Sequence, residues 1–181
     1  MKLVIGLGNP GKQYAKTRHN VGFVIIDALR ECIHGSEWKL SKKFNAEVSE
    51  IGLGDNKIIL AKPMTFMNAS GEAVQLIMHF YKLSVGDIVV IHDDKDLKLG
   101  DTRVQTDRGS AGHNGIKSIM DHIGTKAFTR VRVGIASDNA RKMKDTSDFV
   151  LGKFGVLERK KVKDMIQKSV DNIVALVNAK T

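Results

Sequence analysis

Side chains suited to hydrolysing an ester occur at well-separated points of this 181-residue chain. His19 is a candidate general base, and Asp93 is a candidate carboxylate that would orient the imidazole of His19. Asparagines supply neutral donors and acceptors for a carbonyl group. The segments that carry these groups are Asn9-Pro10, Arg18-His19-Asn20, Met67-Asn68, His92-Asp93-Asp94 and Gly112-His113-Asn114-Gly115. Such a set could activate water beside a carbonyl without a metal ion or a nucleophilic cysteine.

His19 differs from an ordinary surface histidine because it lies in a loop between a predicted buried strand and a predicted helix. A neutral imidazole can take a proton from water near neutral pH, and a carboxylate fixes its tautomer and stabilises the imidazolium. Asp93 follows the apolar run Ile88 to Ile91, so we expect it where a strand ends, with Asp94 and Asp96 as alternatives. The chain has no G-x-S-x-G motif, which favours direct attack by water over an acyl-enzyme.

Other interpretations of these polar residues stay open. The aspartates between Asp93 and Asp96 could bind a metal ion, but they lack the glycine and distal glutamate of an EF-hand loop, and no His/Cys pair at zinc spacing accompanies them. We therefore expect no metal. Asn68 could cap the next helix instead of contacting a substrate. The candidate donors to a tetrahedral intermediate are Asn68, Asn114 and backbone N–H groups of residues 109–115.

The apolar pattern places these residues on alternating strands and helices. Alternating or continuous apolar runs predict strands, and apolar residues at helical spacing predict helices. Strands are expected at 2–7, 45–53, 57–61, 87–92, 102–106 and 130–135, and helices at 21–33, 70–82, 114–122 and 156–177. Asn68 or Ser70 is the expected cap of the second helix, and Gly124 the stop of the third. This order predicts an α/β fold, a single domain over residues 1–181 with a twisted mixed β-sheet surrounded by α-helices.

The segment Gly6 to Gly11 matches the G-x-G-x-x-G pattern of dinucleotide-binding proteins and directly follows a predicted strand. A dinucleotide site needs a helix that begins inside this pattern, whereas the first predicted helix begins only near Val21. The expected acidic residue at the end of a second strand is also missing, because Asp27 lies inside the helix. We therefore expect a turn that ends the strand, and no cofactor. Asn9 still lies at the edge where α/β sheets place their sites.

The net charge of +9 indicates a polyanionic partner, with nucleic acid favoured over anionic lipid, or else a solvated basic surface. No apolar run approaches the roughly 20 residues that a membrane-spanning helix needs. The N-terminal apolar run is too short for a signal peptide. Cys32 is the only cysteine, and its place in an apolar helix predicts a buried thiol. We expect a cytoplasmic protein with no membrane partner.

Seven motifs along the chain resemble those of the bacterial-type peptidyl-tRNA hydrolases. They are VIGLGNPG (4–11), TRHNVGF (17–23), KPMTFMNASG (62–71), HDDKDL (92–97), GSAGHNGIKSI (109–119), RVRVGI (130–135) and DFVLGKF (148–154). Each motif alone is weak, but the ordered set is specific and covers nearly the whole chain. The resemblance implies a monomeric α/β enzyme that hydrolyses the ester between a peptide and the 3′ end of tRNA, which recycles tRNA from aborted translation.

The resemblance also implies roles for individual residues. His19 is expected to be the catalytic base and Asp93 its catalytic support. The expected substrate-binding residues are Asn9, Tyr14, Phe66, Asn68 and Asn114. Among the expected tRNA-binding residues, Arg132 matches a family arginine that helps bind tRNA phosphate. From their charge alone, Arg103, Arg108 and Lys117 could form a phosphate-binding patch with it, which Lys142 and Lys144 could extend. Arg130 either joins this patch, which would make tRNA affinity sensitive to salt, or covers the edge of the sheet.

This chain departs from the family pattern at positions that bear on tRNA binding. Gln105 stands where the family often has a lysine or arginine, and Arg103 or Arg108 could replace that charge. Arg108 stands where a glycine is common, so the following loop could differ in shape. Ser137-Asp138 replaces the usual Arg-Pro after the RVRVGI strand.

Two rival functions are an RNA-binding protein without catalysis and a dinucleotide-dependent enzyme. The intact set of His19, Asp93 and Asn9 speaks against the first, and the late start of the first helix speaks against the second. Release of free tRNA from an N-blocked aminoacyl-tRNA would distinguish the hydrolase from both.

Overall fold

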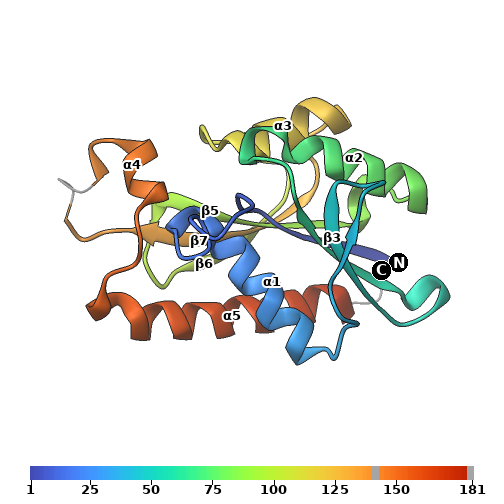
Figure 1. The fold of residues 1–181 in the computed structure, drawn as a ribbon, viewed down its shortest axis with the longest axis horizontal. Helices are drawn as coiled ribbons and strands as arrows, with labels where there is room; N and C mark the ends of the chain where they lie inside the picture. Colours follow the sequence, from blue (N-terminus) through green and yellow to red (C-terminus); the bar gives the residue numbers. More distant parts are fainter. Residues whose placement is uncertain (140–142, 179–181) are drawn as a thin grey trace.

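The computed structural model describes residues 1–139 and 143–178. One mixed sheet of seven strands runs through them in the order β2-β3-β4-β1-β5-β7-β6 (Figure 1). The strands are β1 (Lys2–Gly6), β2 (Lys39–Ser41), β3 (Ala46–Ile51), β4 (Ile58–Pro63), β5 (Ile88–Lys98), β6 (Thr102–Gln105) and β7 (Thr129–Ala136). The predicted α/β fold with a mixed sheet is therefore confirmed.

The centre of the sheet is parallel and its margins are antiparallel. β1 pairs parallel with β4 and β5, and β5 pairs parallel with β7. The predicted hairpin joins β3 to β4, while β6 forms the antiparallel edge beside β7. In the middle of the sheet Val4 lies between Leu60 and Val89. Since β1 and β5 are buried on both faces, they read as continuous apolar runs in the sequence.

Helices cover both faces of the sheet (Figure 1). α1 (Val21–Cys32) and α5 (Arg159–Asn178) pack on one face, and α2 (Ser70–Tyr81) and α3 (Asn114–Ile123) pack on the other. The short helix α4 (Thr146–Leu151) lies at one end of the sheet. The first face buries residues that include Val4, Ile25, Ile91, Val133 and Ile173. The second face buries residues that include Leu3, Ile5, Val74, Val90 and Ile119. No helix among the described residues has the length and apolar character required to cross a membrane.

Short 3-10 turns join several of these elements. They are η1 (Arg18–Asn20), η2 (Gly54–Asn56), η3 (Met67–Ala69), η4 (Val85–Asp87) and η6 (Val156–Glu158). Two of them, η1 and η3, lead directly into α1 and α2. Each therefore places a polar residue just before the N-terminus of a helix, His19 in η1 and Asn68 in η3.

Gly6 in the G-x-G-x-x-G segment allows α1 to pack closely on β1. A Cβ at Gly6 would lie 2.4 Å from the carbonyl oxygen of Gly22, and a Cβ at Gly22 would lie 2.5 Å from that of Leu7. Real Cβ atoms do not approach backbone this closely, so the start of α1 touches β1 only because both residues are glycine. As predicted, the chain reaches α1 only at Val21, after a polar loop and η1.

Several predictions of local structure were wrong. β5 continues to Lys98, so Asp93 lies inside this strand and not after it. Neither Asn68 nor Ser70 caps α2, because η3 leads into this helix and its N-cap is Ala69, which makes no side-chain cap hydrogen bond. The thiol of Cys32 is exposed, since this residue ends α1 on the outer side.

Two elements were not predicted at all. β2 has three residues and α4 has six, and both are too short to give a clear periodic pattern. The predicted stop of α3 is confirmed, because Gly124 takes the left-handed conformation with a φ of 70°.

Candidate active site

A cleft of about 460 Å³ opens at one end of the sheet, where β5, η1, η3, α4 and the start of α3 meet. β1 stops pairing with β5 at Ile91, so the next residues of β5 lose their neighbour on that side and face this cleft. The lining residues include Asn9, His19, Phe66, Asn68, His92, Asp93, His113, Asn114, Val150 and Leu151. The structure therefore brings together the polar residues that the sequence spreads over five segments.

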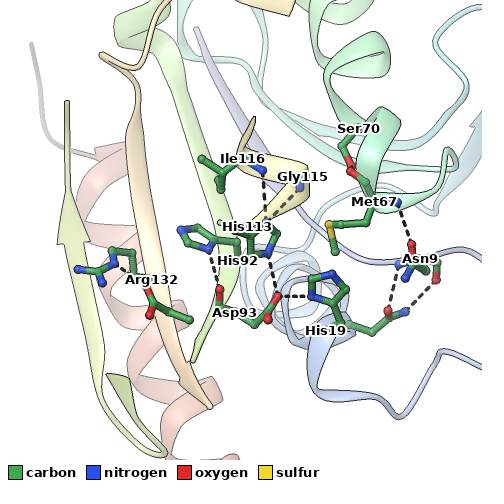
Figure 2. A network of polar contacts seen from close by, with 12 residues as sticks. Asn9, His19, Met67, Ser70, His92, Asp93, His113, Gly115, Ile116 and Arg132 are labelled. Atoms are coloured by element: carbon green, nitrogen blue, oxygen red, sulfur yellow. Dashed lines mark hydrogen bonds and ion pairs between the residues drawn. The ribbon is translucent and has the colours of Figure 1, made fainter. Parts of the chain in front are cut away.

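Asp93 links two histidines at the floor of the cleft (Figure 2). Its Oδ1 lies 2.7 Å from Nδ1 of His19 and 2.9 Å from Nε2 of His113. The Asp93 side chain is 3% exposed and that of His19 is 13% exposed. The predicted pair of His19 and Asp93 is thus in direct contact, while His113 is a third member whose role the sequence did not indicate.

The hydrogen bonds of His113 fix its tautomer. His113 is the N-cap of α3, and its Nδ1 accepts the backbone N–H groups of Gly115 at 3.1 Å and Ile116 at 3.3 Å. Since Nδ1 is an acceptor, Nε2 must carry the proton that is donated to Asp93. Histidine is not among the usual N-cap residues, so the residue pattern did not indicate this arrangement.

The same reasoning assigns the protons of His19. An ionised carboxylate only accepts, so Nδ1 of His19 donates to Asp93 and Nε2 is the unprotonated nitrogen of the neutral ring. Burial alone would raise the pKa of Asp93, but the neighbouring His113 and His19 outweigh it and hold this pKa well below its usual range. Asp93 therefore stays ionised and keeps His19 in the tautomer that can accept a proton from water.

His92 lies directly behind this network. Burial, together with the nearby His113, lowers the pKa of His92 to about 3, so its ring is neutral. Its Nδ1 donates to the carbonyl oxygen of Asp93 at 2.7 Å, and its ring meets that of His113 at an interplanar angle of 74°. His92 thus packs against the network from the side of the sheet (Figure 2).

Three hydrogen bonds hold Asn9, one to its side-chain amide and two to its backbone. The backbone N–H of Met67 donates to Oδ1 of Asn9 at 2.8 Å. The Asn20 side chain accepts the N–H of Asn9 at 3.0 Å and donates to its carbonyl oxygen at 2.9 Å. Because only an oxygen can accept from Met67, Nδ2 of Asn9 is the group left to act as a donor in the cleft. Asn20 is the N-cap residue of α1 but makes no side-chain cap hydrogen bond, and its side chain instead braces Asn9.

The other predicted substrate-binding residues surround the same cleft. Asn68 and Asn114 are exposed in its lining, at η3 and at the first residue of α3. Phe66 also lines it and is 58% exposed. Tyr14 stands against Phe66 edge to face, with 6.4 Å between ring centroids. These two rings form an aromatic corner beside the polar floor.

The predicted tRNA-binding residues divide into exposed and buried groups. Arg103, Arg108 and Lys117 are exposed on β6, on the loop that follows it and on α3. Arg132 is only 3% exposed, and its Nε donates to Asp94 at 2.7 Å while its Nη1 donates to Gln105.

Other basic residues near this surface differ in their environment. Arg130 is buried against the ring of Phe128 and donates to the carbonyl oxygens of Arg108 and Gly109, so it fastens the loop that precedes His113. Lys144 is in the described part of the chain, and Lys142 lies outside the described residues.

One group of histidine and acid side chains in residues 1–139 and 143–178 could hold a metal ion. It consists of His19, Asp93 and His113, whose ligand atoms lie within 4.8 Å of one another. The same atoms hydrogen-bond directly to each other, so a metal would have to displace these protons. Asp94 does not join this group, because its carboxylate accepts from Arg132 and from the N–H of Asp96.

Known proteins are similar to this chain in both sequence and fold. The family model for peptidyl-tRNA hydrolase matches residues 3–181. A peptidyl-tRNA hydrolase of Listeria welshimeri is 48% identical over 174 residues, which cover 96% of this chain and 91% of that protein. One of Fusobacterium nucleatum is 45% identical, covering 98% of this chain and 90% of that protein. The crystal structure of peptidyl-tRNA hydrolase from Acinetobacter baumannii superposes with a TM-score of 0.87 at 33% identity, covering 98% and 88% of the two chains. This chain belongs to the peptidyl-tRNA hydrolase family of enzymes.

Proposed function

We propose that this protein hydrolyses the ester between a peptide, or an N-blocked aminoacyl group, and the 3′ end of tRNA, releasing free tRNA. The observation that carries this proposal is the contact of His19 and His113 with one oxygen of Asp93, in a cleft lined by asparagines. The similarity to known peptidyl-tRNA hydrolases supports the choice of substrate. The consequence in the cell would be recovery of tRNA from aborted translation.

In the proposed reaction His19 activates water. Nε2 of His19 takes a proton from a water molecule whose oxygen attacks the ester carbonyl carbon. Asp93 stabilises the imidazolium, and the N–H of His113 holds the Asp93 carboxylate in place. When the tetrahedral intermediate collapses, the 3′ oxygen of the terminal ribose leaves and takes the proton from the imidazolium.

The negative oxygen of the intermediate requires donors that are already in place. Nδ2 of Asn9 is the first candidate because the N–H of Met67 fixes the side-chain amide and Asn20 fixes the backbone of this residue. Asn68 and Asn114 line the same cleft and complete a set of neutral groups for the carbonyl oxygen and the peptide. Removing one such donor reduces turnover by about 10²- to 10³-fold in comparable sites.

The nucleic acid part of the substrate is proposed to follow the exposed basic residues. Arg103, Arg108 and Lys117 can meet phosphates without rearrangement, whereas Arg132 would have to exchange Asp94 or Gln105 for a phosphate. The aromatic rings of Tyr14 and Phe66 offer faces on which a base of the 3′ end can stack.

We further propose that the enzyme works as a cytoplasmic monomer of one domain. Light scattering of the protein with and without tRNA would test the oligomeric state. A dimer in both samples would contradict this proposal.

The function is tested with an N-acetylated aminoacyl-tRNA. We expect release of free tRNA at catalytic concentrations of protein, and much slower release with His19→Ala. Tight tRNA binding without release would instead support the RNA-binding rival. Binding and release are measured in the same samples, so that an inactive preparation is recognised by its failure to bind.

A further inference from the structure

The segment that contains α4 converges on one side chain, that of Arg18. The Arg18 side chain is 5% exposed, and its Nη2 lies 2.8 Å and 3.1 Å from the two carboxylate oxygens of Glu158. Its guanidinium carbon lies 4.8 Å from the ring centroid of Phe149 and 4.7 Å from that of Phe154. Nη1 reaches the carbonyl oxygen of Ile135 at 3.4 Å. A single guanidinium therefore contacts α4, the residues after it and the end of β7.

The backbone repeats this attachment. The N–H of Arg18 donates to the carbonyl oxygen of Gly152 at 2.9 Å, and Thr17 forms an isolated β-bridge with Lys153. α4 lies at one end of the sheet, and the chain then crosses that end to reach α5 (Figure 1). Arg18 is thus the point at which this crossing segment is fastened to η1, the turn that also carries His19.

Among the described residues, α4 is joined to the core of the molecule mainly through Phe149. Phe149 is its one buried residue among those described, and Phe149 is the residue that rests on Arg18. Two weaker attachments add to this contact: Val150 packs partly buried against the same core, and Lys95 donates an exposed hydrogen bond to Thr146 at 3.0 Å. Yet α4 forms one wall of the cleft through Ser147, Val150 and Leu151. The position of this wall therefore depends on the packing around Arg18.

We propose that Arg18 is a positioning residue that fastens α4 as the apolar wall of the substrate cleft. This inference rests on the proposed function only for its kinetic consequence. The planar guanidinium of Arg18 uses Nη2 on Glu158 and Nη1 on Ile135 while it lies against two aromatic rings, whereas a lysine offers a single nitrogen for all of these contacts. His19 itself is oriented by Asp93 and not by Arg18, so loosening the wall weakens substrate binding without disabling the base.

The test compares Arg18→Lys with Arg30→Lys. Arg30 also pairs with a carboxylate, that of Glu37 at 3.3 Å, but at the far end of α1 and away from the cleft. For Arg18→Lys we expect KM for N-acetylated aminoacyl-tRNA to rise about tenfold, which equals about 1.4 kcal/mol of binding, while kcat stays within about twofold. Arg30→Lys should leave both constants unchanged.

Hydrogen exchange provides a readout that does not need activity. In Arg18→Lys the amides of Phe149 to Gly152 should exchange at least about tenfold faster, with the amides of α1 and α3 unchanged. An unchanged KM, a collapse of kcat at constant KM, or unchanged exchange in α4 would each overturn the proposal. If the unmodified enzyme proves inactive, the proposed function fails and the exchange result alone decides the role of Arg18.

Glu158→Gln keeps the proposal testable if Arg18→Lys does not fold. This change preserves the shape of the partner and removes its charge at a side chain that is 21% exposed. We expect the same direction of change in KM and in α4 exchange, but smaller. Exchange that increases equally in every element would contradict a local role, because it would report lower global stability.

Discussion

At the scale of single residues, the central feature is that Asp93 accepts hydrogen bonds from two histidines. These histidines differ in how many hydrogen bonds hold their rings. The imidazole of His113 is fixed by two backbone N–H donors at the start of α3. The ring of His19 is held through Nδ1, by Asp93, and its Nε2 bonds to no other group among the described residues. One histidine therefore supports the carboxylate and the other can change its protonation. A buried, ionised Asp93 stabilises positive charge on His19 when a proton arrives.

Replacement of His113 can separate its two roles. Asparagine is a good N-cap, so His113→Asn should preserve α3 while its shorter side chain loses contact with Asp93. We expect kcat to fall roughly 10- to 100-fold, with a free energy of unfolding within about 1 kcal/mol of the original. The measurements are steady-state kinetics and urea unfolding. Undiminished kcat in a folded variant would mean that His113 is only a helix cap.

Buried His92 predicts a specific dependence of stability on pH. Its pKa falls from about 6.5 in the unfolded chain to about 3 in the folded protein. The unfolded state therefore binds more protons between these values, so this contribution is complete above about pH 6.5 and is lost as the pH falls towards 3. Between pH 7 and pH 5 the loss from His92 is about 2 kcal/mol.

The matched variant for this prediction is His92→Phe, which keeps a ring at the position and cannot bind a proton. Urea unfolding at pH 7 and pH 5 should show a smaller loss of stability on acidification in the variant than in the original protein. Equal losses in both proteins would place the acid sensitivity in other groups.

At the scale of elements, the cleft exists because α1 begins in direct contact with β1 and so presents η1 at the sheet end. Gly22→Ala would add a Cβ 2.5 Å from the carbonyl oxygen of Leu7 and 2.7 Å from that of Ile91. Backbone cannot move easily there, so we expect a loss of about 1–3 kcal/mol despite the better helix propensity of alanine. Thermal and urea unfolding measure this loss.

The control for Gly22→Ala is Gly86→Ala. Its added Cβ would meet only Oγ of Ser84 at 4.0 Å. We expect a change of less than about 0.5 kcal/mol for this exposed position. If Gly22→Ala were equally neutral, the close packing of α1 on β1 would not be required for the fold.

The sequence predicted the long elements well because their burial is periodic. The long helices α1, α2 and α3 and the central strands each bury several apolar residues in a core. The resulting apolar periodicity can be recognised in a single sequence. The prediction failed where tertiary contacts set the structure. β5 continues through a polar stretch because β7 pairs with it as far as Lys98, and α4 is held by one buried phenylalanine.

Most residues of the site were predicted from the sequence, but the hydrogen bonds that join them were not. His19, Asp93 and the asparagines were recognised by residue type, and their segments meet as expected. The cap made by His113 and the brace made by Asn20 depend on distances between segments, which spacing along the chain does not reveal. The same reason explains why the buried pair between Asp94 and Arg132, an expected tRNA-binding residue, was not predicted.

At the scale of the whole molecule, the net charge of +9 is not spread over one surface. Exposed cations occur on β6 and α3, and also along α5, which packs on the other face of the sheet from α3. If tRNA follows the first group, Arg103→Gln should weaken binding and reduce the salt dependence of log Kd by about one unit, as loss of one phosphate contact requires.

Lys168→Gln removes the same charge from α5 and is the control for Arg103→Gln. Its effect on the salt dependence should be negligible, because Lys168 is exposed on the helix that covers the other face. Filter binding at several salt concentrations gives both slopes. Equal slopes for the two variants would mean that only net charge matters and that no tRNA path follows β6.

The most direct measurement compares chemistry and binding in His19→Ala. Single-turnover release of tRNA from an N-acetylated aminoacyl-tRNA should slow by at least about 10³-fold, because the variant lacks the proposed base that takes the proton from water. The Kd for tRNA should stay within about twofold, since the ring of His19 contacts Asp93 and no predicted phosphate site. A variant that released tRNA at the original rate would show that water is activated elsewhere.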